Sequence, residues 1–287
     1  MAEQVKDAAA FCADLVRSHD FPRYATTVFL PGVHRRPILA LYAFNVEISR
    51  IREQVSQPLP GQMRLQWWTD LLAGHDHGGI EGNPVASELL WTIRTWRLPV
   101  ERLAQLIIEH EFDLYNDPMP SLSALEGYSN DTASTLFACC ARILVRSSEA
   151  IDHVARHAGL AYGMIDVLNK LPQDTARKQL FLPAQFLEQH GSSVAEVYAG
   201  KQTPQNRAAV DQLVAEASKQ LKTAMALLAE LPAEARPAFL PLALVRRDIK
   251  RMERRDYDPF AVRRMPRFRM LWALWRASRS PEFRGGA

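Results

Sequence analysis

The stretch ALYAFNVEISRIREQ, residues 40–54, decides the fold of this protein. Residues 40–44 are apolar or aromatic and have the character of a helix that packs into a core. From Asn45 onward the stretch turns polar, and its charged side chains include Arg50 and Glu53. A helix of this kind either runs out of the core into solvent or directs its polar end into a water-filled cavity. The stretch alone leaves both interpretations open.

The composition is that of an ordinary globular protein with ample material for a core. Of the 287 residues, 47% are hydrophobic and 23% are charged, and the 13 glycines are few enough to favour helices. The cysteines, Cys12, Cys139 and Cys140, make a poor disulfide framework and indicate a reducing compartment. The N-terminus does not read as a secretory signal, and no run of about 18 apolar residues predicts a membrane-spanning helix. We therefore expect a cytoplasmic protein.

Helical periodicity dominates the chain, and no run of alternating apolar and polar residues predicts strands. Residues 122–147 read as a bent or interrupted pair of helices, 21–31 as a connection, and Pro37 is expected in the first turn of a helix. The other predicted helices cover residues 6–18, 36–54, 63–73, 85–96, 100–115, 148–171, 182–190, 205–229 and 236–256, with a last helix around 272–275. No linker is long enough to divide the chain, so we predict one all-α domain over residues 1–287.

Two carboxylates in the sequence EHEFD, residues 109–113, are four positions apart. On a continuous helix, Glu109 and Asp113 would lie on one face, one turn apart. Such a pair could hold a divalent cation through its oxygens, and it could equally form part of a solvated helix face. The spacing does not choose between the two.

A second polar segment, DVLNKLPQDTARKQLFLP, covers residues 166–183. Asp166, Lys170 and Asp174 recur every four residues and would share one face of a continuous helix. Pro172 disfavours helical geometry at the residue before it and removes a backbone donor. We therefore expect the helix to kink or end there, with Asp174 in the loop beyond. Because this apolar helix also ends in charged residues, its end and that of the opening stretch could meet around one cavity.

These two segments resemble the signatures of the squalene/phytoene synthase family. FLPGVHRRPILALYAF, residues 29–44, is similar to the family's A-L-Y-A-F stretch, and residues 166–183 align without gaps on its second signature. YSNDTASTLFACCARIL and RDIKRMERRDYDPF resemble two further helices of the family. The resemblance covers residues 11–275 and implies an isoprenoid-synthase-type helical bundle around a central cavity. It also implies that the polar half of the opening stretch faces that cavity.

The resemblance assigns a ligand-binding or anion-binding role to side chains from both segments. The expected cavity residues are Tyr42, Ser49, Arg50, Glu53, Asp166, Lys170, Asp174 and Arg177.

The sequence departs from the family at the positions that carry its chemistry. Active members have two aspartate clusters that face each other across the cavity and hold Mg²⁺ for the substrate diphosphate. Here Ser49 and Arg50 stand in place of the two leading aspartates of the first cluster, and only Glu53 remains. In the second cluster Lys170 replaces one aspartate and Asp174 remains. Because cationic side chains oppose a divalent cation, we expect no metal and no cofactor.

The alternative is an active prenyl transferase of squalene/phytoene-type biosynthesis, which would require Mg²⁺. Its candidate catalytic residues are Glu53, Asp174, Glu109 and Asp113. Turnover of a prenyl diphosphate would distinguish this alternative from a protein without catalysis.

The departures resemble those of one subgroup of the family, the mitochondrial complex I assembly factors with a degenerate squalene/phytoene-synthase-like domain. ALYAFNVEISRIREQVS, MRLQWWTDLL and RKQLFLP are all similar to segments of that subgroup. The resemblance implies a role in the biogenesis of respiratory complex I at the inner membrane, with assembly proteins as partners. It also implies a prenyl diphosphate or another lipid as the cavity ligand.

The C-terminal segment, residues 245–287, is strongly basic. Residues 245–284 hold thirteen Lys and Arg against five Asp and Glu, a net charge of +8, whereas the whole chain carries +3. The sequence RRMPRFRMLWALWRASR mixes arginines with aromatic residues that include Trp272 and Trp275. This composition suits peripheral contact with an anionic membrane surface, and it is equally typical of a core-packing helix with a solvated cationic face. Nucleic acid is not an expected partner, because no recognised binding module accompanies the charge.

Overall fold

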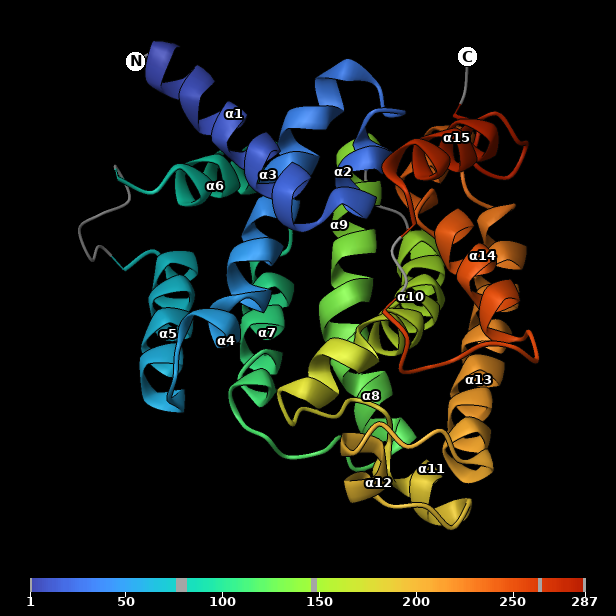
Figure 1. Ribbon diagram of the computed structural model, residues 1–287. Helices are drawn as coiled ribbons and strands as arrows, with labels where there is room; N and C mark the ends of the chain where they lie inside the picture. The colour runs from blue at the N-terminus through green and yellow to red at the C-terminus, as the bar shows by residue number, and fades with distance from the viewer. Residues whose placement is uncertain (1, 76–81, 146–148, 263–264, 286–287) are drawn as a thin grey trace.

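The structure is a computed structural model that describes residues 2–75, 82–145, 149–262 and 265–285. Within these ranges every regular element is a helix and no strand occurs, which confirms the predicted all-α class (Figure 1). The elements are, in chain order, α1 (Ala2–His19), α2 (Phe21–Thr27), α3 (Gly32–Ser49), α4 (Ile51–Gln54), α5 (Pro58–Ala73), α6 (Pro84–Trp96), α7 (Val100–Glu109), the 3₁₀-helix η2 (Phe112–Leu114), α8 (Leu122–Ser129), the π-helix η3 (Asn130–Ser134), α9 (Thr135–Leu144), α10 (Glu149–Ala176), α11 (Ala184–Gln189), α12 (Val194–Tyr198), α13 (Pro204–Leu228), the 3₁₀-helix η4 (Ala233–Phe239), α14 (Leu242–Met252) and α15 (Arg267–Ser278).

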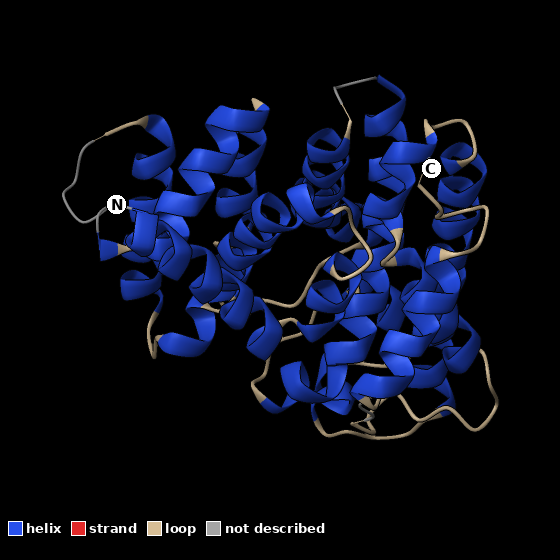
Figure 2. Ribbon diagram, turned by 90° about the horizontal axis from the view of Figure 1, so that it is seen from above, coloured by secondary structure: helices blue, strands red, loops and turns tan. Residues whose placement is uncertain are grey.

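Helix α10 is the central element of the bundle. It packs against α13, α9, α14 and η3, while α3 packs against α1, α6 and α9. Figure 1 shows α13 and α14 along one side of α10, and α5 on the opposite side of the molecule. The view from above in Figure 2 shows the helices arranged in a ring. One hydrophobic core contains residues from Cys12 to Phe283 and joins these elements.

The expectation of a connection over residues 21–31 is wrong, because α2 forms there. The Asp20 side chain caps this helix by accepting a hydrogen bond from the Arg23 backbone N–H at 3.2 Å. Pro22 lies in the first turn, where its missing N–H leaves no helical hydrogen bond unmade. The cap brings Asp20 and Arg23 to the wall of the cavity described below.

The predicted helix 36–54 is two helices. Helix α3 already begins at Gly32, so Pro37 lies inside the helix rather than in its first turn. Arg50, with φ −98° and ψ 0°, interrupts the helix before α4 begins. The interruption separates the core-packing part of the stretch from its charged end. Similarly, α5 begins at Pro58, five residues ahead of its predicted start.

Helix α10 continues through Pro172, so the predicted end at that proline is wrong. A proline in a helix interior removes one hydrogen bond and strains the preceding turn. Leu171 beside it is only 1% exposed, and apolar burial along this face outweighs the local cost. Asp174 therefore lies on the same helix as Asp166 and Lys170 and not in a loop.

The predicted interruption of the helix over 122–147 is confirmed. Helix α8 passes into the π-helical segment η3 before α9 begins. The backbone of η3 approaches α10 so closely that a Cβ atom on Gly159 would overlap the backbone of Ser134. Ser134 in turn donates a hydrogen bond from its hydroxyl to the Arg156 carbonyl at 3.1 Å. This close packing fixes the wall of the bundle that α8 and η3 share with α10.

Candidate functional site

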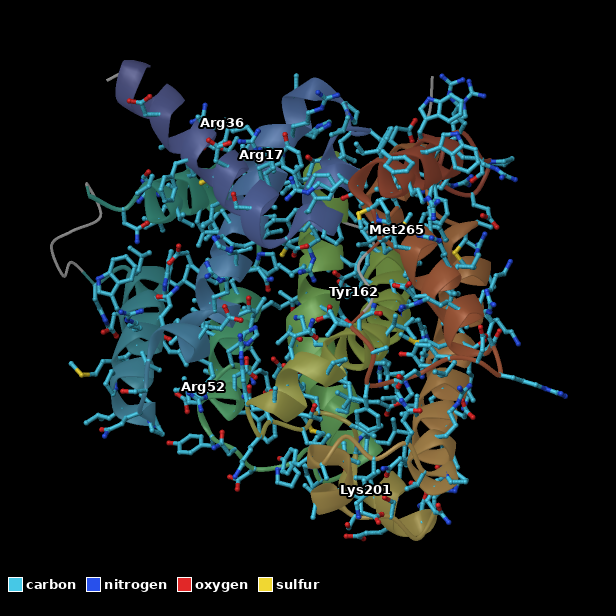
Figure 3. All side chains as sticks on the ribbon, in the orientation of Figure 1. Arg17, Arg36, Arg52, Tyr162, Lys201 and Met265 are labelled. Carbon is cyan, nitrogen blue, oxygen red and sulfur yellow. The ribbon has the colours of Figure 1, made fainter. Side chains whose placement is uncertain are left out.

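A cavity of about 470 Å³ opens among α3, α4, η2, α8, η3 and α10. Its volume falls in the range of small-molecule sites, roughly 300–1,000 Å³. Arg52 of α4 and Tyr162 of α10, both labelled in Figure 3, line it from two sides. The charged end of the opening stretch therefore faces a cavity.

Seven of the eight side chains expected at the cavity line it. They are Ser49, Arg50, Glu53, Asp166, Lys170, Asp174 and Arg177. The exception is Tyr42, which is 4% exposed and lies behind the wall. Its hydroxyl hydrogen-bonds with Cys140 of α9, because this face of α3 packs on α9. Whether the seven bind a ligand stays a prediction.

Three cations at the cavity, Arg50, Lys170 and Arg177, are paired with carboxylates from the same wall. Arg50 Nε lies 3.2 Å from a Glu53 oxygen, and Arg177 Nη1 lies 2.9 Å from the other. Lys170 Nζ lies 2.7 Å from Asp166 Oδ2, one helical turn away on α10. The Arg177–Glu53 pair joins the end of α10 to α4, although the two residues are 124 positions apart in the sequence.

The lining as a whole carries balanced formal charge. Its basic side chains are Arg23, Arg50, Arg52, Lys170 and Arg177, and its acidic side chains are Asp20, Glu53, Asp113, Asp166 and Asp174. With Arg50 and Lys170 among these side chains, the wall has neither an excess of acids nor an excess of cations. The pKa of Glu53 is lowered, since hydrogen bonds from Arg177 and Arg50 outweigh the opposing effect of burial.

The carboxyl of Asp174 has its pKa raised to about 7. Burial is the main cause, and the negative charges of Asp166 and Asp113 add to it, whereas Lys170 and Arg177 oppose it. The pKa of Lys170 is also raised, chiefly by the negative charge of Asp166, while burial opposes this shift. Asp174 is therefore a carboxyl that titrates near neutral pH beside a fixed cation.

The prediction that Glu109 and Asp113 lie on one helical face is wrong, because α7 ends at Glu109 and the chain then forms η2. Glu109 accepts a hydrogen bond from Gln105 at 3.0 Å and is not among the cavity residues. Asp113 does line the cavity, with its carboxylate turned to His110 and Tyr128. The two carboxylates therefore do not form a common cation site.

A buried His–Asp–Tyr cluster forms this part of the wall, and sequence reasoning did not assemble it. His110 Nδ1 lies 2.6 Å from Asp113 Oδ2, and the Tyr128 hydroxyl donates to Asp113 Oδ1 at 3.0 Å. Gln179 donates to the Asp113 carbonyl at 2.6 Å. The only signal in the sequence is His110 beside the acidic residues of EHEFD, and nothing local connects it with Tyr128.

A second unpredicted group comes from the start of α2. Arg23 Nη1 lies 2.7 Å from Asp20 Oδ2, and the guanidinium stacks over Tyr162 at 4.7 Å from the ring centroid. All three residues line the cavity. Nothing in the sequence indicates this group, because residues 21–31 read as a connection and Tyr162 is more than 130 positions away.

The residues present do not fit a magnesium cluster of the family type. Glu53 and Asp166 are already occupied by arginine and lysine, and Lys170 holds its ammonium where a second carboxylate would be needed. Over the part of the chain that the structure describes, no group of three or more His, Cys, Asp or Glu side chains is arranged to hold a metal ion. The absence of a metal from the working protein nonetheless stays a prediction.

No helix in the described ranges has both the length and the apolar character needed to cross a membrane. The longest helix at the C-terminal end, α15, covers only Arg267–Ser278.

Comparison with known proteins agrees with the architecture. Residues 16–276 match the squalene/phytoene synthase family. A protein named "NADH dehydrogenase (ubiquinone) complex I, assembly factor 6" from Rattus norvegicus is 31% identical over 89% of this chain and 77% of its own length. Phytoene synthase 3 of the Zea mays chloroplast is 24% identical over 94% of this chain and 65% of its own length. A solved dehydrosqualene synthase superposes with a TM-score of 0.83 at 15% identity, covering 96% of this chain and 97% of that one.

The match over residues 16–276, the helical bundle and the cavity between the two signature segments lead to one conclusion: the chain belongs to the squalene/phytoene synthase family.

Proposed function

We propose that this chain is an assembly factor for respiratory complex I that keeps the family's cavity as a ligand site and does not catalyse Mg²⁺-dependent prenyl transfer. The observation that carries the proposal is the pairing of the cavity carboxylates with cations of the same chain, Glu53 with Arg50 and Arg177 and Asp166 with Lys170. The rat relative, which is more similar to this chain than the maize phytoene synthase, carries the name of a complex I assembly factor.

A magnesium ion would have to displace cations of the chain from the carboxylates it needs as ligands. Mg²⁺ binds near-ideal octahedra of carboxylate, phosphate and water oxygens. Glu53 would have to release two guanidinium groups and Asp166 an ammonium group before either could act as a ligand. Each displaced cation would then lie within a few ångströms of the divalent ion and repel it. The tethered cations thus take the place that metal ions would need.

The proposed ligand is a prenyl diphosphate or another lipid. Apolar side chains that include Leu136, Val167 and Phe181 line part of the cavity and suit a hydrocarbon chain. A head group with negative charge would have to compete with Glu53 for Arg50 and Arg177. The ligand is therefore expected to bind without metal and more weakly at high ionic strength.

An active prenyl transferase is the second candidate. Two carboxyls of the cavity wall, Asp113 and Asp174, are not paired with arginine or lysine in any salt bridge of the described residues, and both residues line the cavity. If catalysis survives, these groups carry it.

We place the protein at the membrane face on which the complex is assembled, in peripheral contact.

The test combines a deletion with a turnover assay. Deleting the gene is expected to lower assembled complex I on native gels, and the wild-type chain and a Glu53→Gln, Asp174→Asn variant are both expected to restore it. Purified protein incubated with farnesyl or geranylgeranyl diphosphate and Mg²⁺ is expected to yield no condensed product. Product that disappears in Asp174→Asn, together with failure of the double variant to restore the complex, would establish the prenyl transferase instead.

A further inference from the structure

A groove on the outside of the bundle, between α14 and α15, combines apolar and cationic side chains. Its volume is about 910 Å³, nearly twice that of the central cavity. Phe268, Trp272, Ala273 and Ala277 of α15 form the apolar part. Met265, which Figure 3 labels, also lines the groove. The groove lies apart from the cavity, since the two share no lining residue.

Several large apolar side chains are exposed on and next to α15. In the described ranges, twelve large hydrophobic side chains are exposed, and four of them fall within residues 262–275. They include Phe268 at 69% exposure, Trp272 at 59% and Trp275 at 43%. Leu274, on the opposite face of α15, is fully buried. The helix therefore packs on the bundle with one face and presents a second, aromatic face to solvent.

The charge around this aromatic face is positive. The groove is lined by four arginines and one acidic residue, Glu282; the arginines are Arg246, Arg247, Arg269 and Arg276. Arg246 Nη1 lies 2.9 Å from Glu282 Oε2 and forms a salt bridge with it. In the described part of the chain no salt bridge joins Arg269 or Arg276 to a carboxylate.

The arginines and aromatic rings are arranged together. The Arg276 guanidinium lies 5.8 Å from the ring centroid of Trp272, and that of Arg279 lies 4.3 Å from Trp275. Tryptophan prefers the boundary between hydrocarbon and water, and arginine beside it is placed to contact lipid phosphates. A helix of 12 residues is too short to span a bilayer but long enough to lie in its surface.

We propose that α15 and its groove with α14 dock the protein on a membrane that contains anionic phospholipid. The rings of Phe268, Trp272 and Trp275 enter the head-group boundary, and Arg269 and Arg276 bind phosphate groups. Charge complementarity favours an anionic membrane over a neutral apolar partner, because such a partner would leave the two guanidinium groups without a counter-charge. The inference rests on the proposed function only in placing the protein at the membrane face, and it names the surface and the lipid class.

The position of α15 in the fold suits this role. It packs on α14 and α2 at the outer edge of the bundle, as Figure 1 shows, with no other described helix over its aromatic face. Arg267 stacks over Phe21 of α2 at 4.4 Å from the ring centroid and fixes the start of α15. The docking face is therefore held on the bundle by contacts with two helices.

Vesicle co-sedimentation with the full chain tests the proposal. Binding is expected to vesicles of phosphatidylglycerol and phosphatidylcholine, with little binding to phosphatidylcholine alone and a loss of binding as salt rises. An Arg269→Gln, Arg276→Gln variant should bind about 20-fold to 30-fold more weakly, from about 1 kcal/mol for each charge. Trp272→Ala should bind about tenfold more weakly, and its blue shift in tryptophan fluorescence on binding should be smaller.

Matched controls change the same kinds of residue elsewhere. Arg94→Gln with Lys222→Gln removes two exposed cations, and Leu59→Ala with Met63→Ala removes two exposed apolar side chains. Both controls should bind vesicles like the wild type.

Equal binding to neutral vesicles, or equal loss in the control variants, would overturn the inference. Absence of vesicle binding together with a dimer that Trp272→Ala dissociates would show that a second copy of the chain covers the groove instead. Neither outcome concerns the loss of complex I in the deletion strain, so the inference and the proposed function can fail separately.

Discussion

Replacing Asp174 with asparagine should make the stability of the protein less sensitive to pH. In the folded protein the Asp174 carboxyl keeps its proton up to pH about 7, whereas its unshifted pKa is 3.8. Between these values the folded state binds more protons than the unfolded state, so the free energy of unfolding falls as the pH rises. The contribution is fully present below about pH 4 and is lost as the pH rises through about 7. An asparagine at this position would carry no such proton and no buried charge.

The size of the effect follows from the shift. A separation of about 3 pH units corresponds to about 4 kcal/mol, at about 1.4 kcal/mol for each unit. Between pH 5 and pH 7 the wild type should therefore lose about 2 kcal/mol of stability relative to Asp174→Asn. The variant should be the more stable protein at pH 8, because it removes a carboxylate that burial and the neighbouring Asp166 and Asp113 disfavour.

Urea unfolding at pH 5, 6, 7 and 8, followed by circular dichroism, measures this difference. Asp117→Asn is the matched control, because Asp117 is an exposed aspartate in the loop after η2. Its stability curve should run parallel to that of the wild type. A difference between wild type and Asp174→Asn that stays constant over this pH range would refute the reasoning, since it would show that Asp174 is ionised throughout.

Two further predictions concern the packing that holds the cavity in place. Gly159→Ala should lower the free energy of unfolding by about 3 kcal/mol or more in urea unfolding, because the new methyl group would meet the backbone of Ser134 rather than a movable side chain. A decrease of less than about 1 kcal/mol would show that η3 can move away from α10. Glu88→Ala should cost about 2–3 kcal/mol by the same measurement, because Glu88 is 3% exposed and binds Arg36 through both oxygens at 2.7 and 2.8 Å. In a double-mutant cycle with Arg36→Met, a coupling near zero would argue against this pair.

Several features of the site could be predicted because they depend on residues that are near in sequence. The change from apolar to polar character within residues 40–54 leaves a helix end in solvent and a helix end at a cavity both open, and the family resemblance favours the cavity. The structure places Ser49, Arg50 and Glu53 at a cavity. The resemblance to the family's second signature likewise predicts Lys170 at a position where the family has an aspartate. Neither observation reveals which carboxylate each cation contacts.

Other features depend on contacts between distant segments and could not be predicted. Tyr42 has the same local surroundings as its neighbours on α3, yet its hydroxyl turns to Cys140 of α9. Pro172 predicts a helix end by local rules, but burial of Leu171 in the core outweighs the local strain. His110 and Tyr128, 18 positions apart, come together only because η2 and α8 face the same cavity.

The sequence by itself therefore determined the all-α class and the charged residues at the ends of the two signature segments, because helical periodicity and residue chemistry are local properties. Its resemblance to the family implied that aspartates are missing there. Only the tertiary structure decided that the cavity wall is electrically balanced, because the partners of its cations come from other turns and other helices. The Arg177–Glu53 pair, which spans 124 positions, is the clearest case. Its geometry is set by how α10 packs beside α4, and no pattern within either segment encodes that distance.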